Sequence, residues 1–118
     1  MSENVSTVTL EDLESFFGVN AEFLDPNAPW PYTQAKFEVH NGPWSVRASL
    51  YIASLDVAFS ISIDGHIVYE LDAQQAQEIL VHRDTRSVSL EITLSDYSRI
   101  FLRLSPTPSV HQELTVGA

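Results

Sequence analysis

The order of apolar and polar residues changes from a helical period near the N-terminus to a two-residue period in most of the remaining chain. Residues 9–18 are predicted to form a helix, with Thr9 and Asp12 as a capping box and Gly18 as the stop. Three apolar residues recur at the spacing of one helical face: Leu10, Leu13 and Phe17. A helix of two turns is unstable alone in water, so it must pack against the rest of the protein.

From residue 35 onward, apolar residues occupy alternate positions, which is the pattern of half-buried strands. The segments 44–52 and 55–63 are expected to form a hairpin that places Leu50 opposite Val57. The loop between them has either two or four residues, because Ala-Ser is not a favoured pair for a two-residue hairpin turn.

The next turn lies at Asp64-Gly65, which is a typical signal for a two-residue hairpin turn. That register would turn Glu70 toward the core without a partner, which is costly. A three-residue loop, residues 64–66, instead places Ile67 opposite Ile63 and keeps the apolar sets on one face. The sequence therefore favours the three-residue loop.

A further hairpin is expected from the segments 88–94 and 100–104, with Leu94 opposite Ile100. Residues 72–82, which connect the hairpins, fit either a short helix followed by a strand or a strand alone. The periodicity does not separate these two possibilities.

These elements predict one α+β domain, an N-terminal helix followed by an antiparallel meander of six to seven strands. One face of the meander is apolar throughout and needs a cover. We therefore expect the sheet to curl as a half-barrel or roll around the helix, or two molecules to share the apolar face. The expected segments are residues 1–8 as a disordered tail, 9–18 as the helix, 19–34 as a proline-rich strap, 35–105 as the sheet and 106–118 as a tail that is loose or adds an edge strand.

The strap contains the stretch Asp-Pro-Asn-Ala-Pro-Trp-Pro-Tyr, residues 25–32. As a binding segment it would offer Trp30 and Tyr32 to a partner in an extended proline-rich conformation. We favour a structural role instead, in which Trp30 covers the edge of the core and proline reduces the entropy lost on folding.

Net charge narrows the range of partners. The 118 residues include 16 acidic and six basic side chains, for a net charge of −10. Such a chain is repelled by nucleic-acid phosphates and anionic membranes, whereas an acidic surface attracts a basic protein. The absence of cysteine, of a signal-peptide pattern and of a long apolar run leads us to expect a cytoplasmic protein.

No motif in the sequence indicates catalysis, a metal or a cofactor. The four histidines show no metal-ligand spacing, the serines mostly alternate along predicted strands, and the four glycines are isolated. Enzyme activity is left open but is not favoured, and no catalytic residue, metal or cofactor is expected.

The leading hypothesis is a small acidic, non-enzymatic binding protein, such as an inhibitor or immunity-type partner of a basic protein. A homodimer is a further option. The candidate interaction surface combines arginine and aromatic residues of the polar sheet face, including a row on the expected edge strand, with one strap residue: Tyr32, Arg47, Tyr51, Arg99, Phe101 and Arg103.

Two alternatives stay open. One is a small-ligand-binding protein or minor enzyme, with a pocket inside the curled sheet. The expected lining of that pocket is aromatic: Phe16, Phe17, Trp44, Phe59 and Tyr69. The other alternative is a structural subunit of a larger assembly.

Overall fold

The computed structural model describes residues 8–30, 32–84, 87–105 and 107–113. Its architecture is α+β, with one α-helix followed by strands, as predicted. The elements are α1 (Leu10–Phe17), β1 (Glu22–Phe23), β2 (Ala35–Asn41), β3 (Trp44–Tyr51), the 3₁₀ turn η1 (Ile52–Ser54), β4 (Asp56–Ile63), β5 (His66–Ala73), β6 (Glu78–Arg83), β7 (Val88–Thr93), β8 (Arg99–Arg103) and β9 (Ser109–Glu113).

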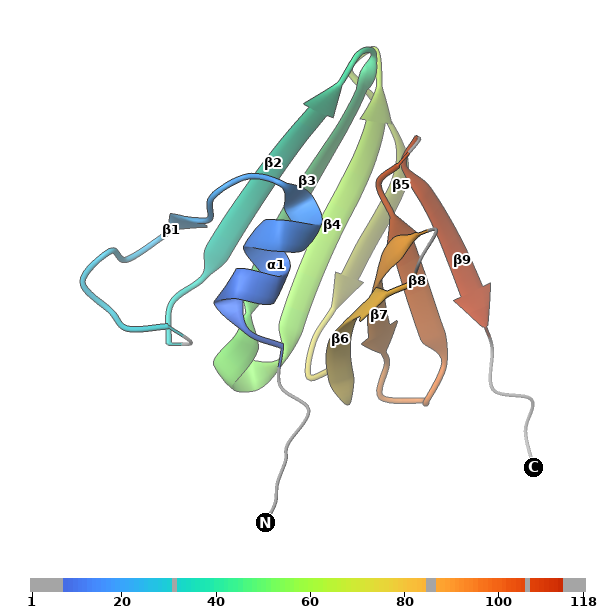
Figure 1. Ribbon diagram of the computed structural model, residues 1–118. Coiled ribbons are helices and arrows are strands. Elements are labelled where there is room, and N and C mark those ends of the chain that lie inside the picture. The colour runs from blue at the N-terminus through green and yellow to red at the C-terminus, as the bar shows by residue number, and fades with distance from the viewer. Residues whose placement is uncertain (1–7, 31, 85–86, 106, 114–118) are drawn as a thin grey trace.

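The strands form two antiparallel sheets, one of five strands in the order β1-β2-β3-β4-β5 and one of four in the order β6-β7-β8-β9 (Figure 1). The expected half-barrel or roll is not confirmed, because the strands divide between two sheets. The described residues contain nine strands, more than the six to seven predicted. The additional strands are β1, within the proline-rich segment, and β9, which realises the edge strand considered for the tail.

The apolar faces of the two sheets contribute to one core, and α1 contacts both sheets through β2, β6 and β7. Leu13 is fully buried, and Phe17 stacks on Phe37 of β2 with ring centroids 4.6 Å apart. The predicted capping box is confirmed: the Asp12 N–H donates to Thr9 Oγ1 at 3.0 Å, and the Thr9 N–H donates to Asp12 Oδ2 at 3.4 Å. The helix thus supplies apolar side chains between the sheets.

The hairpin of β3 and β4 has the predicted register, with Leu50 opposite Val57. Tyr51 and Asp56 form the last pair, so the connection is the four-residue alternative. Leu55 takes a left-handed conformation, φ 56°, to close it.

The turn between β4 and β5 differs from the prediction in an informative way. Ile63 lies opposite His66, so Asp64-Gly65 is a two-residue turn and the three-residue loop is wrong. A register shift follows within three residues, because Val68 is an extra residue in β5. This bulge places Tyr69 opposite Ile61, which keeps Glu70 on the polar face. Both sequence signals are satisfied, since the bulge compensates for the short turn.

The hairpin of β7 and β8 is shifted by two residues from the prediction. Ile100 lies opposite Ile92 and not opposite Leu94. Leu94 belongs to the turn, where its N–H donates to the Ser98 carbonyl at 2.8 Å. A two-residue shift leaves every side chain on its original face, so alternation could not distinguish the two registers.

The uncertain segment 72–82 is strand at both ends, because β5 runs to Ala73 and β6 begins at Glu78. The part of the proline-rich segment that follows β1 connects it to its paired strand β2, and the Leu24 N–H donates to the Gln34 carbonyl at 3.0 Å. Trp30 packs, partly buried, against the core. Within the described residues, no helix has the length and apolarity needed to span a membrane.

Candidate interaction surface on the five-stranded sheet

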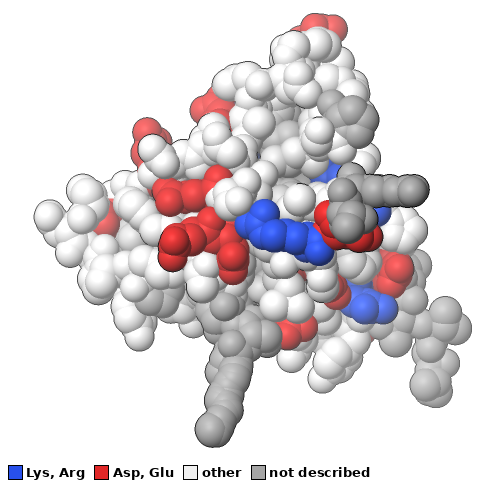
Figure 2. All heavy atoms as spheres, in the orientation of Figure 1, with Lys and Arg blue, Asp and Glu red and all other residues white. Residues whose placement is uncertain are grey.

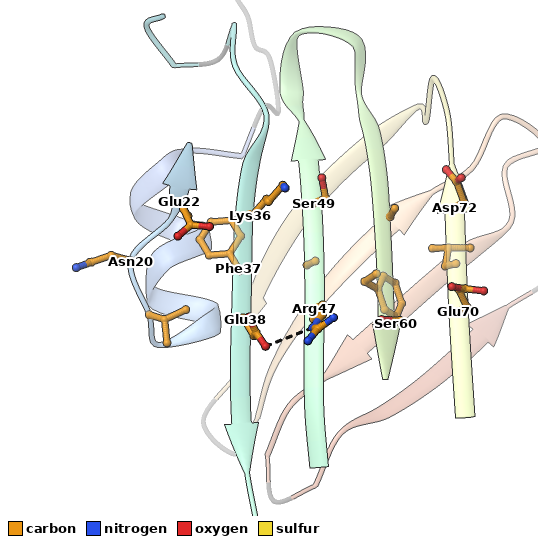
Figure 3. A pocket seen from close by; sticks show the side chains of 15 residues that line it. Asn20, Glu22, Lys36, Phe37, Glu38, Arg47, Ser49, Ser60, Glu70 and Asp72 are labelled. Carbon is orange, nitrogen blue, oxygen red and sulfur yellow. Dashed lines mark hydrogen bonds and ion pairs between the residues drawn. The ribbon is translucent and has the colours of Figure 1, made fainter. Parts of the chain in front are cut away.

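The outer face of the five-stranded sheet carries a hollow of about 690 Å³, on the side away from the core (Figure 3). We call it the outer hollow. Its lining comes from the segment after α1 and from β1 to β5: Val19, Asn20, Glu22, Lys36, Phe37, Glu38, Arg47, Ala48, Ser49, Ala58, Phe59, Ser60, Glu70, Leu71 and Asp72. Strand register arranges its polar side chains in two rows across the sheet.

The first row runs from Glu38 of β2 through Arg47 and Ser60 to Glu70 of β5. Arg47 Nε lies 3.3 Å from Glu38 Oε2, so the arginine is paired at the β2 side of the row. Glu70 faces only the neutral Ser60 as its cross-strand neighbour.

The second row runs from Glu22 of β1 through Lys36, Ser49 and Ala58 to Asp72 of β5. Glu22 and Lys36 are directly opposite across the β1–β2 pair, where opposite charges attract. Asp72 faces the neutral Ala58.

The two rows therefore have the same asymmetry. Both basic side chains of the outer hollow adjoin an acidic neighbour near β1 and β2, whereas the β5 side ends in Glu70 and Asp72 (Figure 3). We call these two groups the β5 carboxylates. Among the described residues neither forms a salt bridge, and both side chains are exposed. The lining has four acidic and two basic residues, so it is suited to a cationic ligand.

The outer face of the four-stranded sheet is organised differently, around Glu91 of β7. This residue is only 6% exposed. His82 Nε2 lies within hydrogen-bonding distance of Glu91 Oε1, and Arg99 Nη1 lies 3.6 Å from Glu91 Oε2. Arg99 Nη2 also lies 3.0 Å from Glu113 Oε1 on β9. Buried charges are normally paired in this way, since an unpaired one is costly.

Aromatic contacts complete this second face. Phe101 lies opposite Glu91 on β8, and its ring centroid is 6.5 Å from that of His82 and 6.1 Å from that of His111. The Arg99 guanidinium is 6.0 Å from the Phe101 centroid. The charged groups on the outer face of the four-stranded sheet thus interact mainly with one another. In the part of the chain described, no group of three or more His, Asp or Glu side chains could hold a metal ion.

The structure divides the predicted interaction surface between three places. Arg47 and Tyr51 lie on β3 of one sheet, whereas Arg99, Phe101 and Arg103 lie on β8 of the other. β8 is not an edge strand, because β9 pairs with its outer side. Tyr32 lies between β1 and β2 and is 63% exposed. Arg47 is the member of this set that lines the outer hollow.

The predicted aromatic pocket lining lies mostly in the core. Phe16, Phe17 and Phe59 are 8%, 3% and 3% exposed, and Phe59 stacks on Tyr69 with centroids 5.6 Å apart. Trp44 is partly buried against the core. Phe59 is the member of this set that also borders the outer hollow, which lies on the face of the sheet that points away from the core.

Sequence reasoning did not select the acidic residues of the outer hollow, although Glu70 and Asp72 alternate with Tyr69 and Leu71. That alternation was the available signal for an outward-facing acidic pair. Figure 2 shows a second concentration of Asp and Glu over the position of α1. The acidic residues of the first helical turn are Glu11 and Asp12, whose negative charges interact favourably with the positive end of the helix dipole.

Comparison with known proteins identifies a similar fold. The structure matches a chain of the contact-dependent growth inhibition toxin–immunity protein complex from Klebsiella pneumoniae 342, with a TM-score of 0.72 and 11% sequence identity. The match covers 90% of this chain and 93% of that chain. No protein-family model matches the sequence, and a search of the curated proteins gives no match. At this identity the likeness shows a shared fold.

Proposed function

We propose that this protein is a small acidic binding protein that masks a basic protein partner, in the manner of an immunity protein. The observation that carries the proposal is the pair of β5 carboxylates, which lie at the outer hollow with no cationic neighbour across the strand. A lysine or arginine of a partner would supply the missing charge, through hydrogen bonds stronger than those between neutral groups.

Two further observations support this function. The similar fold comes from a complex that contains a toxin and an immunity protein. The net charge of −10 would accelerate the encounter with a basic partner, because long-range attraction raises association rates. We place the encounter in the cytoplasm, since a chain without cysteine suits a reducing compartment.

The experiment is affinity purification of the tagged protein from cells of its source at about 50 mM salt, where charge attraction is weakly screened. We expect a basic polypeptide to co-purify in stoichiometric amount. Expression of that polypeptide alone should arrest growth, and co-expression of this protein should restore it.

The matched variants are the double substitution Glu70→Lys/Asp72→Lys and the control Glu11→Lys, which changes an exposed acidic residue of α1. The double variant should fail to protect growth, and the control should protect as well as the wild type. Equal protection by all three proteins would contradict the proposal, as would a captured polypeptide without any effect on growth.

A further inference from the structure

The strand that carries the β5 carboxylates has an open outer edge. β5 pairs with β4 on one side, and among the described residues no strand pairs with its other side. It has eight residues, whereas β1, at the opposite end of the sheet, has two. An open edge presents alternate backbone N–H and C=O groups that are available to another strand.

The inward face of β5 is also incompletely covered. Tyr69 and Leu71 are partly buried, whereas their partners on β4, Ile61 and Phe59, are each 3% exposed. Burial raises the pKa of Tyr69 above its usual value of 10.0. The cover of the core therefore ends at β5, and a strand added beyond it would bury more of these side chains.

We propose that β5 accepts an extended segment of the protein partner as a sixth strand of this sheet, with basic and apolar residues in alternation. This inference rests on the proposed function and specifies how the partner binds. The basic side chains would face the β5 carboxylates, and the apolar ones would cover Tyr69 and Leu71. Side chains directly opposite in an antiparallel pair lie about 4.5–5.5 Å apart at Cβ, close enough for both contacts.

The bulge sets one limit of this docking segment. The extra residue Val68 interrupts the regular spacing of β5, and Ile67 and Val68 are 60% and 55% exposed. Bulges disturb strand pairing, so regular addition is confined to residues 69–73. This is the part of β5 that holds both carboxylates.

Charge distinguishes a basic segment from a second copy of this chain. Antiparallel pairing of two β5 strands along residues 69–73 would bring the Glu70 and Asp72 side chains of both copies together. Like charges opposite one another destabilise a sheet, so the carboxylates oppose self-pairing. The same charges favour a partner strand with lysine or arginine.

The test uses a synthetic peptide of about eight alternating lysine and valine residues, a length typical of an added strand. Three peptides are compared at low salt: the Lys–Val peptide, a Glu–Val peptide, and a Lys–Val peptide with N-methylated backbone amides on the pairing edge. Amide hydrogen exchange of the intact protein is followed by NMR. We expect the Lys–Val peptide to slow exchange of the outward-facing amides of residues 69–73 by about tenfold or more.

Variants of the protein then separate charge from backbone pairing. Glu70→Lys should weaken binding of the Lys–Val peptide by about tenfold or more, and the control Glu11→Lys should change it by less than about twofold. The Glu–Val and N-methylated peptides should leave β5 exchange unchanged.

The inference is overturned if the N-methylated peptide binds as tightly as the Lys–Val peptide, because attraction without strand pairing would then suffice. It is also overturned if the Lys–Val peptide leaves β5 exchange unchanged, or if the purified protein dimerises through β5. A partner that is neutralised without any change at β5 would refute this inference and leave the proposed function standing. If the peptide adds to β5 but no growth-arresting partner exists, the proposed function is refuted and the strand-addition site on β5 stands.

Discussion

The outer faces of the two sheets use charge in opposite ways. On the four-stranded sheet, Glu91 is buried between His82 and Arg99, and Arg99 also forms an ion pair with Glu113. On the five-stranded sheet, Glu70 is exposed and faces Ser60. Both glutamates occupy the outward position of a strand, so their difference arises from the neighbours that the register gives them.

This difference separates a structural charge from one available for binding. Glu91 contributes to stability because its partners belong to the same chain. Glu70 gains nothing comparable within the protein, so its negative charge is available to another molecule. The predictions below test this distinction, from the largest expected effect to the smallest.

The first prediction compares alanine at the two glutamates. Glu91→Ala should lower the free energy of unfolding by about 2 kcal/mol, because it removes charged hydrogen bonds and buried contacts. Glu70→Ala should change the same free energy by less than about 0.5 kcal/mol. Urea denaturation of both variants measures the difference, and equal losses would remove the distinction between the two faces.

The second prediction concerns the cation of the buried network. Arg99→Ala should lower the free energy of unfolding by about 1 kcal/mol at low salt, a moderate loss because the arginine side chain is 51% exposed. The loss should shrink at about 1 M salt, since screening weakens the pair in the wild type. Arg47→Ala, which removes the pair with Glu38 on the other sheet, is the control and should have the smaller effect.

The third prediction is that the β5 carboxylates cost the free protein some stability. Glu70→Lys/Asp72→Lys changes the net charge from −10 to −6 and so reduces self-repulsion. Thermal unfolding at low salt should show the variant as stable as the wild type, or more stable by up to about 0.5 kcal/mol. A clear loss of stability would mean that these side chains have a structural role.

The fourth prediction concerns Asp96, in the turn before β8. Its pKa is lowered mainly by a hydrogen bond from the Ser98 side chain, and further by the Ser98 N–H, which donates to Asp96 Oδ1 at 2.9 Å. A lowered pKa in the folded state means that the ionised form stabilises the turn above the ordinary value of 3.8. That contribution is lost as the pH falls through the lower, folded-state pKa. NMR titration of the Asp96 carboxyl should give a midpoint below 3.8, and Ser98→Ala should move it upward.

Local features were predictable because nearby residues determine them. Thr9, Asp12 and Gly18 define the ends of α1 through backbone hydrogen bonds and a left-handed residue. The pairing of Leu50 with Val57 followed from alternation on both sides of a short loop.

Register was less predictable where several registers preserve the same alternation. The turn hydrogen bond between Leu94 and Ser98 accompanies the pairing of Ile92 with Ile100. The apolar pattern alone fits this register and the predicted one equally well. At β5, alternation correctly kept Glu70 outward but did not reveal that a bulge achieves this. Ile67, Tyr69 and Leu71 alternate in the sequence without a break, so the sequence does not show that the extra residue Val68 places Ile67 opposite Ser62 and Tyr69 opposite Ile61.

The arrangement of the site was beyond the sequence because alternation does not say which strands share a sheet. Arg47 and Phe101 were assigned to one polar face, yet they lie on different sheets. The burial of Glu91 depends on neighbours from the strands on both sides of it, β6 and β8. Such proximity requires the complete topology.

The position of α1 has a consequence for the order in which the protein matures on the ribosome. The helix is synthesised before the strands that it contacts, but two turns do not persist alone, and part of its contact surface belongs to β6 and β7. The apolar core also includes Ile100 and Leu102. Helix α1 therefore completes its packing only after the strands of the four-stranded sheet have emerged, so its docking is a late step in the folding of this domain.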